Sequence, residues 1–271
     1  MKKTKKWPFY LIVTLLALYL IIPLFVTFIY SIATTWSTTL LPSGLTLKWY
    51  AQMFEDPTFI KALIRTLVLI LISMLVVLLI MIPTVVVVSM HFPRLERLFQ
   101  SLVLLPYAMP GIILASGLLQ TYSTIEIPKL LLLGGAYFIV VMPYMYQGIR
   151  NSLHSVNMTS LIESAELMGA NQLEIFFKII IPNIKKGILV SSLLSFSILF
   201  GEFTLTNLVV GGNYETIQIY LFRIMQVSGH LSSAVVIAYL FVLSILSFAI
   251  ILFTNGRRTK SSAVVQHREV D

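Results

Sequence analysis

The sequence has no cysteine among its 271 residues, and only 11% of its residues are charged. Without cysteine, the chain has no disulfide framework, no thiolate nucleophile and no cysteine-ligated metal site. Soluble domains contain about 25% charged residues and about 45–50% apolar residues. Because 58% of this chain is hydrophobic, its composition excludes an ordinary soluble domain and indicates an integral membrane protein.

Several catalytic motifs are also missing from the sequence. No stretch matches GxxxxGK[ST], the loop that cradles nucleotide phosphates, so we expect that the chain does not hydrolyse ATP itself. HExxH and GxSxG are missing too, and the 4 histidines show no spacing typical of metal ligands. We therefore expect a protein that is not an enzyme and that holds no cofactor or metal of its own.

Long apolar stretches indicate membrane-spanning helices, which need ~20 mostly apolar residues. Lipid offers no hydrogen-bond partner to an exposed backbone, so each stretch is predicted to be helical. The stretches are residues 8–31, 59–89, 99–121, 129–149, 186–209 and 232–254. Prolines inside or at the edges of several of them are expected to kink or end the helices. The prediction is an all-α membrane protein, with a single domain over residues 1–255 and a flexible basic tail over residues 256–271.

The chain has a net charge of +8, and the positions of its basic residues indicate a membrane topology. Most of the 19 Lys and Arg residues lie at the two ends of the chain, between spans two and three, or between spans four and five. These positions share one side of a six-span chain, and cytoplasmic loops are rich in Lys and Arg. We therefore place both termini in the cytoplasm, expect lipid around the spans and expect no nucleic-acid partner.

The connection between Arg150 and Lys186 is polar and longer than most unstructured connections. Near its start, Asn157, Thr159 or Ser160 is of the residue type that caps a helix. Apolar residues then recur at helical spacing, at Leu161, Ile162, Ala165 and Met168. This pattern predicts a short first helix on the cytoplasmic side.

A glycine and a second capping signal follow that helix. Gly169 is placed to end it, because glycine adopts the positive φ that commonly closes a helix. Asn171, with Glu174 three residues later, predicts a capping box that starts a second helix. Pro182 is expected to break this second helix at the bilayer. Residues 155–182 are thus predicted to form a helix–glycine–helix elbow.

The elbow also carries a spaced pattern of residues. Glu163-Ser164-Ala165 is separated by three residues from Gly169, and Ile179-x-Ile181-Pro182 follows nine residues later. The pattern resembles the EAA motif of binding-protein-dependent ABC importer permeases, E-A-A, three residues, G, nine residues, I-x-L-P. Here serine replaces the central alanine and isoleucine replaces the leucine. The segments LTLKWYAQMFEDPTFIKALIRTL, LLPYAMPGIILASGLL and VVGGNYETIQIYLF also look like permease segments, so the resemblance covers most of residues 1–255.

The resemblance implies a six-span permease of type I ABC importer architecture in a bacterial cell membrane. In this family the elbow is a coupling helix, which docks into a groove on a separate ATPase subunit that binds ATP and Mg. The family also implies a second permease subunit, expected to be related but different, and an extracytoplasmic solute-binding protein. The residues that it assigns to ATPase coupling are Glu163, Ser164, Ala165, Met168, Gly169 and Ala170.

The predicted fifth span holds one acidic residue deep in an apolar segment. Such a charge is costly in lipid and normally faces the interior of a helix bundle. At about 100° per residue, four polar residues of this span share one face of a continuous helix: Ser191, Ser195, Glu202 and Thr206. We expect this stripe to line the pore. Two roles stay open for Glu202, namely contact with a cationic substrate or pairing with a backbone donor or gating partner.

The substrate follows only from the resemblance, which is closest to permeases for spermidine, putrescine and 2-aminoethylphosphonate. Importers of ferric iron or thiamine are the alternative within the family. A secondary transporter or channel that uses no ATP is the alternative of another class. Secondary carriers commonly show inverted repeats and channels show filter motifs, and the sequence has neither.

Overall fold

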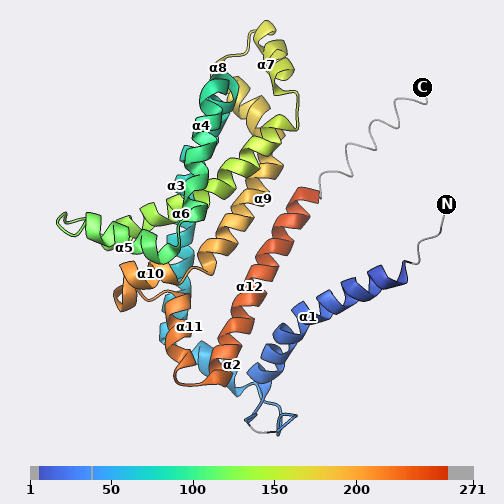
Figure 1. The fold of residues 1–271 in the computed structure, drawn as a ribbon, viewed down its shortest axis with the longest axis vertical. Coiled ribbons are helices and arrows are strands. Elements are labelled where there is room, and N and C mark those ends of the chain that lie inside the picture. Colours follow the sequence, from blue (N-terminus) through green and yellow to red (C-terminus); the bar gives the residue numbers. More distant parts are fainter. Residues whose placement is uncertain (1–5, 38, 256–271) are drawn as a thin grey trace. The chain divides into compact units, whose positions relative to one another are not determined.

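The computed structural model describes residues 6–37 and 39–255, and most of these residues are helical (Figure 1). An isolated β-bridge joins Ala33 and Leu45 in the loop after the first helix. The all-α fold predicted from the sequence is confirmed, whereas the predicted tail over residues 256–271 lies outside the described residues. The helices are α1 (Trp7–Ile32), α2 (Lys48–Glu55), α3 (Pro57–His91), α4 (Pro93–Leu104), η1 (Leu105–Ala108), α5 (Gly111–Thr121), α6 (Lys129–His154), α7 (Met158–Leu167), α8 (Gln172–Glu174), η2 (Ile175–Ile180), α9 (Ile181–Phe200), α10 (Thr204–Val209), η3 (Gly211–Tyr214), α11 (Ile217–Met225) and α12 (Gly229–Asn255).

The chain divides into two compact units. The first comprises the described parts of Met1–Lys61 and Tyr220–Ser244, and the second those of Ala62–Ile219 and Ile245–Asp271. In the first unit α2 packs against α1, and the ring of His230 stacks on the rings of Tyr30 and Trp49. The second unit holds the whole predicted elbow and the predicted polar stripe.

Among the described residues, five helices are long and apolar enough to span a membrane, or six if the bent pair α4–α5 forms one span. The predicted third span, 99–121, is therefore not a straight helix: its two parts meet at 101° (Figure 1). The cause is local, because Pro110 disfavours a helical conformation of the residue before it. That residue, Met109, is extended, with φ −99° and ψ 118°.

The predicted fifth span, 186–209, has different bounds in the structure. The helical span begins earlier, at Gln172, and ends at Phe200, after which the chain turns through Gly201 and starts α10 at Thr204. The assumption of one continuous helix through Glu202 is therefore wrong. Pro182 was predicted to break the helix, and this prediction is also wrong. The turn before it, η2, is a π-helix, whose wider hydrogen-bond spacing relieves the clash that a proline makes with the preceding turn.

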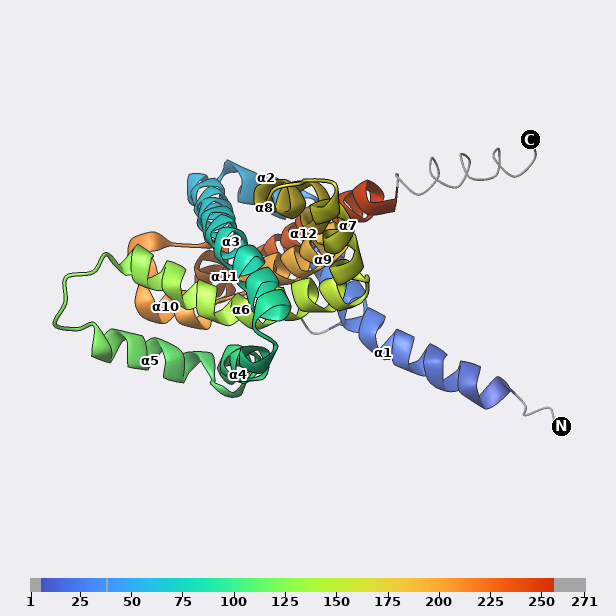
Figure 2. The ribbon, with the colours of Figure 1, turned by 90° about the horizontal axis from the view of Figure 1, so that it is seen from above.

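Helices α6 and α9 lie side by side through the second unit and make its most extensive helix packing (Figures 1 and 2). Small residues allow the close approach: a Cβ added to Gly187 would overlap the hydroxyl of Ser152 and the carbonyl of Gly148. The two helices present Gly148 and Ser152, and Gly187 and Ser191, at four-residue spacing, a pattern that favours close helix packing in membranes. Because α6 leads into the elbow and α9 leads out of it, this packing fixes the base of the elbow.

Candidate functional site

The first helix of the elbow, α7, starts as the sequence predicts. Asn157 is its N-cap, and the side chain of Asn157 accepts a hydrogen bond from the backbone N–H of Ser160 at 3.4 Å. Of the three proposed caps, Asn157 is therefore the one used. Inside the helix, the hydroxyl of Ser164 donates to the carbonyl of Ser160, at 2.8 Å.

The turn at the end of α7 is set by Gly169, whose φ is +80°. The N–H of Gly169 donates to the carbonyl of Glu166 at 2.9 Å, and the N–H of Ala170 donates to the carbonyl of Ala165 at 3.0 Å. These two bonds form a Schellman motif, which satisfies carbonyl groups left free at the helix end. No atom lies within 4 Å of a Cβ added at Gly169, so its backbone conformation, and not space within the chain, requires glycine there.

The second half of the elbow is fixed by the predicted capping box. The side chain of Asn171 accepts from the N–H of Glu174 at 2.9 Å, and the carboxylate of Glu174 accepts from the N–H of Asn171 at 3.3 Å. The amide of Gln172 reaches back across the turn to the carboxylate of Glu166, at 3.1 Å. The sharp turn is thus held by hydrogen bonds on both sides, as a stiff element requires.

The elbow buries one side and exposes an apolar end. Ala165 and Ile175 are buried where α7 packs against η2. At the turn itself, four large apolar side chains are between 65% and 90% exposed: Leu167, Met168, Leu173 and Phe177. Exposed apolar patches of this kind mark interaction surfaces. Met168 therefore does not share the buried environment of Ala165, although the sequence placed both on one apolar stripe.

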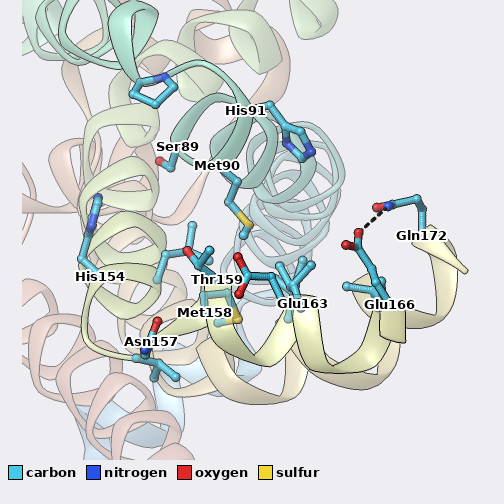
Figure 3. A pocket seen from close by; sticks show the side chains of 16 residues that line it. Ser89, Met90, His91, His154, Asn157, Met158, Thr159, Glu163, Glu166 and Gln172 are labelled. Carbon is cyan, nitrogen blue, oxygen red and sulfur yellow. Dashed lines mark hydrogen bonds between the residues drawn. The ribbon is translucent and has the colours of Figure 1, made fainter. Parts of the chain in front are cut away.

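A pocket of about 480 Å³ opens beside the elbow (Figure 3). The end of α3 contributes Met90 and His91 to it, and α7 contributes Thr159, Glu163 and Glu166. Figure 3 shows the side chain of Met90 pointing toward α7 and the Gln172–Glu166 hydrogen bond at the far edge of the pocket. Two carboxylates thus line a hollow next to the exposed apolar end of the elbow.

A charged cluster connects the start of α4 to the end of α6, next to the pocket. Oε1 of Glu96 accepts from Nε of Arg150 at 2.6 Å and lies 3.2 Å from Nε2 of His154. The hydroxyl of Ser89 also donates to this oxygen, at 3.3 Å. Only 12% of the Glu96 side chain is exposed. The cluster is a contact between elements far apart in sequence, so no local sequence pattern predicts it.

The residues assigned to ATPase coupling lie together on the elbow but differ in exposure. Glu163, Ser164, Met168 and Gly169 are exposed, Ala170 is half-buried and Ala165 is 2% exposed. Ala165 therefore faces the interior of the chain. Contact of these six residues with an ATPase stays a prediction.

The predicted pore-lining residues do not share one helical face, because the chain breaks at Gly201. Ser191, Ser195 and Thr206 are buried within the chain, with 3%, 0% and 0% exposure. Ser191 lies in the packing between α6 and α9, and its hydroxyl donates to the carbonyl of Gly187 at 2.7 Å. Glu202 is half-buried just before α10, where its carboxylate accepts from the N–H groups of Leu205 and Thr206 at 2.7 and 3.0 Å. Their role in lining a pore stays a prediction.

Sequence comparison gives the family. Residues 80–260, about two-thirds of the chain, match the family described as "Binding-protein-dependent transport system inner membrane component". The chain belongs to this family. It is therefore the membrane-embedded permease subunit of an ABC importer, a transport component and not a catalytic one. The resemblance inferred from the EAA-like pattern is confirmed.

A curated relative of this permease is the spermidine/putrescine transport system permease protein PotC of Haemophilus influenzae. The two are 23% identical over 187 residues, which cover 68% of this chain and 71% of the relative. The relationship supports the family assignment, while an identity this low leaves the substrate to be argued separately.

Solved structures share the fold of this permease. A chain of a bacterial alginate ABC transporter, in complex with a periplasmic protein bound to alginate pentasaccharide, matches with a TM-score of 0.68 at 18% identity. The match covers 94% of this chain and 96% of the other. The methionine transporter MetNI, in an inward-facing conformation, matches with a TM-score of 0.61 at 17% identity over 74% of this chain and 98% of the other.

Proposed function

We propose that this permease forms half of the translocation pore of an ATP-driven importer and that its elbow docks on a separate ATPase subunit. The observation that carries the proposal is a turn fixed by a Schellman motif and a capping box that exposes Leu167 and Met168 at 90% and 81%. A stiff turn with an exposed apolar end is suited to sit in a groove on a partner, and its fold relatives belong to ABC transporters.

The mechanism is alternating access driven from the elbow. ATP binding closes two ATPase subunits, which moves the elbows of the two permeases together. Because the turn is internally hydrogen-bonded, it passes this motion on as a rigid-body displacement. The packing of α6 against α9 then carries the displacement from the elbow into the membrane.

The proposal extends to the remaining partners, which the family membership supports. The second half of the pore is a related but different permease, and an extracytoplasmic solute-binding protein delivers the cargo. Both termini lie in the cytoplasm of a bacterial cell, on the side of the elbow. ATP and Mg are bound by the ATPase subunits, and this chain holds no cofactor.

The cargo is a small cationic amine, spermidine or putrescine, or the related zwitterion 2-aminoethylphosphonate. The relationship to PotC supports the polyamines. Specificity in such a system resides largely in the solute-binding protein, which meets the cargo first.

Uptake into proteoliposomes that hold the full complex tests the proposal. Labelled spermidine, putrescine and 2-aminoethylphosphonate are supplied with the solute-binding protein on one side, and ATP is supplied on the side of the elbow. Uptake that requires ATP and persists after ion gradients are collapsed is expected. Uptake that follows an ion gradient and ignores ATP would instead assign the chain to secondary transport.

A further inference from the structure

The break between α9 and α10 is closed by an unusually complete set of hydrogen bonds. Oε1 of Glu202 accepts from the N–H of Leu205 at 2.7 Å, and Oε2 accepts from the N–H of Thr206 at 3.0 Å and from its hydroxyl at 2.8 Å. An ionised carboxylate offers about four acceptor positions. Three of these are already used within the chain, which leaves little capacity for an ammonium group of the cargo.

The hydrogen bonds continue from Glu202 into α6. The hydroxyl of Thr206 lies 2.6 Å from the phenol oxygen of Tyr137. Thr206 has one hydroxyl proton and donates it to Glu202, so the phenol must donate to Thr206. The result is a directed chain from Tyr137 through Thr206 to Glu202, and both Tyr137 and Thr206 are buried, with 2% and 0% exposure.

Other contacts also hold the chain in place at the break between α9 and α10. On the α9 side, the carbonyl of Phe200 accepts from the side-chain amide of Gln218 at 3.0 Å. On the other side, α10 packs against both α5 and α6 (Figure 2). A Cβ added at Gly111, the first residue of α5, would touch Thr204 and Leu205. The start of α10 therefore packs beside the start of α5. The break between α9 and α10 thus adjoins the bend between α4 and α5.

We propose that Glu202 is a positioning residue: its carboxylate holds the start of α10 in place and ties it to α6, and it does not bind the cargo. The proposal uses the permease role of the chain and does not depend on which cargo is carried. Transport requires α10 to move as a unit with its neighbours. Loss of the hydrogen bonds that hold the start of α10 therefore lowers the rate of transport and leaves recognition of the cargo unchanged.

Uptake kinetics in the full complex separate positioning from cargo binding. Glu202→Gln keeps the shape of the side chain but replaces one acceptor with an NH₂ group, and Thr206→Val removes the hydroxyl while leaving the carboxylate. With labelled spermidine as the probe, each change is expected to lower Vmax about fivefold, which is about the fold-change that corresponds to one lost intramolecular hydrogen bond. KM is expected to change by less than about twofold. The double variant is expected to be no worse than the worse single variant, because both changes break one network.

Glu126→Gln, in the exposed loop after α5, is the matched control for loss of one acidic charge, and it is expected to transport normally. A large rise in KM with normal Vmax in Glu202→Gln, together with normal transport in Thr206→Val, would overturn the proposal and make Glu202 a cargo ligand. Normal kinetics in both variants would overturn it as well.

A second readout needs no cargo. The chain has no native cysteine, so Val209→Cys, at a position on α10 with 1% exposure, introduces its only thiol. Maleimide labelling of this thiol is expected to be about fivefold faster when Glu202→Gln is added, and Ser123→Cys in an exposed loop is expected to react equally in both backgrounds. Equal labelling of Val209→Cys in both backgrounds would overturn the proposal. If the unmodified complex takes up no spermidine, the proposed cargo fails, and this labelling still tests whether Glu202 holds the start of α10 in place.

Discussion

Oε1 of Glu96 lies 2.6 Å from Nε of Arg150, so one carboxylate joins the start of α4 to the end of α6. His154 and Ser89 share the same oxygen. The ion pair is largely shielded from water, with 28% of the Arg150 side chain exposed. It lies at the base of the elbow, where a displacement of α7 would be transmitted to α6 in the proposed mechanism.

Glu96→Gln removes the charge from this cluster while keeping its shape. Hydrogen bonds to charged groups contribute about 1.5 to 3 kcal/mol, so we expect a loss of about 1 to 2 kcal/mol in the free energy of unfolding. Thermal unfolding in detergent measures it. Lys178→Met is the control, because the Lys178–Glu174 pair is exposed and such helix pairs contribute about 0.3 to 0.5 kcal/mol. Equal losses in the two variants would contradict a special role of Glu96.

Gly169 can be tested through its backbone conformation. Gly169→Ala forces a Cβ into a positive φ, which costs about 1 to 2 kcal/mol, and it is expected to weaken both the elbow and the capture of the ATPase. Asparagine tolerates this conformation better, so Gly169→Asn is expected to be milder.

Gly211 provides the matched control, because its φ is +54° and nothing crowds its missing Cβ. Gly211→Ala is expected to destabilise the chain by a similar amount without affecting ATPase capture. Loss of capture in Gly211→Ala would show that the effect of Gly169→Ala comes from general destabilisation.

The exposed end of the elbow separates docking from folding. Leu167→Ser and Met168→Ser change side chains with little contact inside the chain, so unfolding of the isolated permease is expected to be unchanged. Capture of the ATPase is expected to fall at least about tenfold, because a few buried apolar contacts dominate an interface. Leu40→Ser, in the loop after α1 with 97% exposure, should leave capture intact, and equal capture by all three variants would contradict the docking surface.

The close packing of α6 against α9 leaves no space for a methyl group at Gly187. The added Cβ would overlap backbone as well as a side chain, and overpacking of this kind costs about 1 to 3 kcal/mol. We therefore expect Gly187→Ala to lower thermal stability and to reduce transport. Gly117→Ala in α5 meets no atom within 4 Å and is expected to be neutral or slightly stabilising.

In the first unit, the lowered pKa of Asp56 predicts that stability depends on pH. Burial raises the pKa of Asp56, but this is outweighed by hydrogen bonds from Thr58 and Tyr220 and by the charge of Arg223, so the pKa is lowered overall. The unfolded chain then binds the proton more readily, so Asp56 stabilises the fold above its ordinary pKa, and this stabilisation is lost as the pH falls through the lowered value. Unfolding measured between about pH 3 and 7 is expected to depend less steeply on pH in Asp56→Asn, and an unchanged slope would contradict the assignment.

The elbow could be predicted from sequence because its signals are local. Asn157, Gly169, and the pair Asn171 and Glu174 act within four residues of their own positions. The break at Gly201 could not be found this way. An apolar run with a glutamate looks helical throughout. The local bonds of Glu202 to Leu205 and Thr206 are joined at the break by contacts with Tyr137 and Gln218, which lie far away in the sequence.

One prediction from the prolines is confirmed and one is wrong, each for a physical reason. Prolines were expected to kink or end the spans, and this is confirmed in the third span, where the chain bends by 101° between Ala108 and Gly111. Pro182 was expected to break a helix, and the π-helical turn before it accommodates the ring. The small residues of the α6–α9 packing were visible in the sequence as Gly148/Ser152 and Gly187/Ser191, and their spacing is the signal that would have predicted this contact.

The central claim is that the elbow couples this permease to a separate ATPase, and co-purification tests it most directly. The tagged permease is isolated in mild detergent, and the proteins that elute with it are identified by mass spectrometry. The account predicts about one P-loop ATPase per permease, lost in Glu163→Lys and Gly169→Trp while the companion permease is retained. A permease that elutes without any ATPase, under conditions that keep other ABC importers intact, would contradict it.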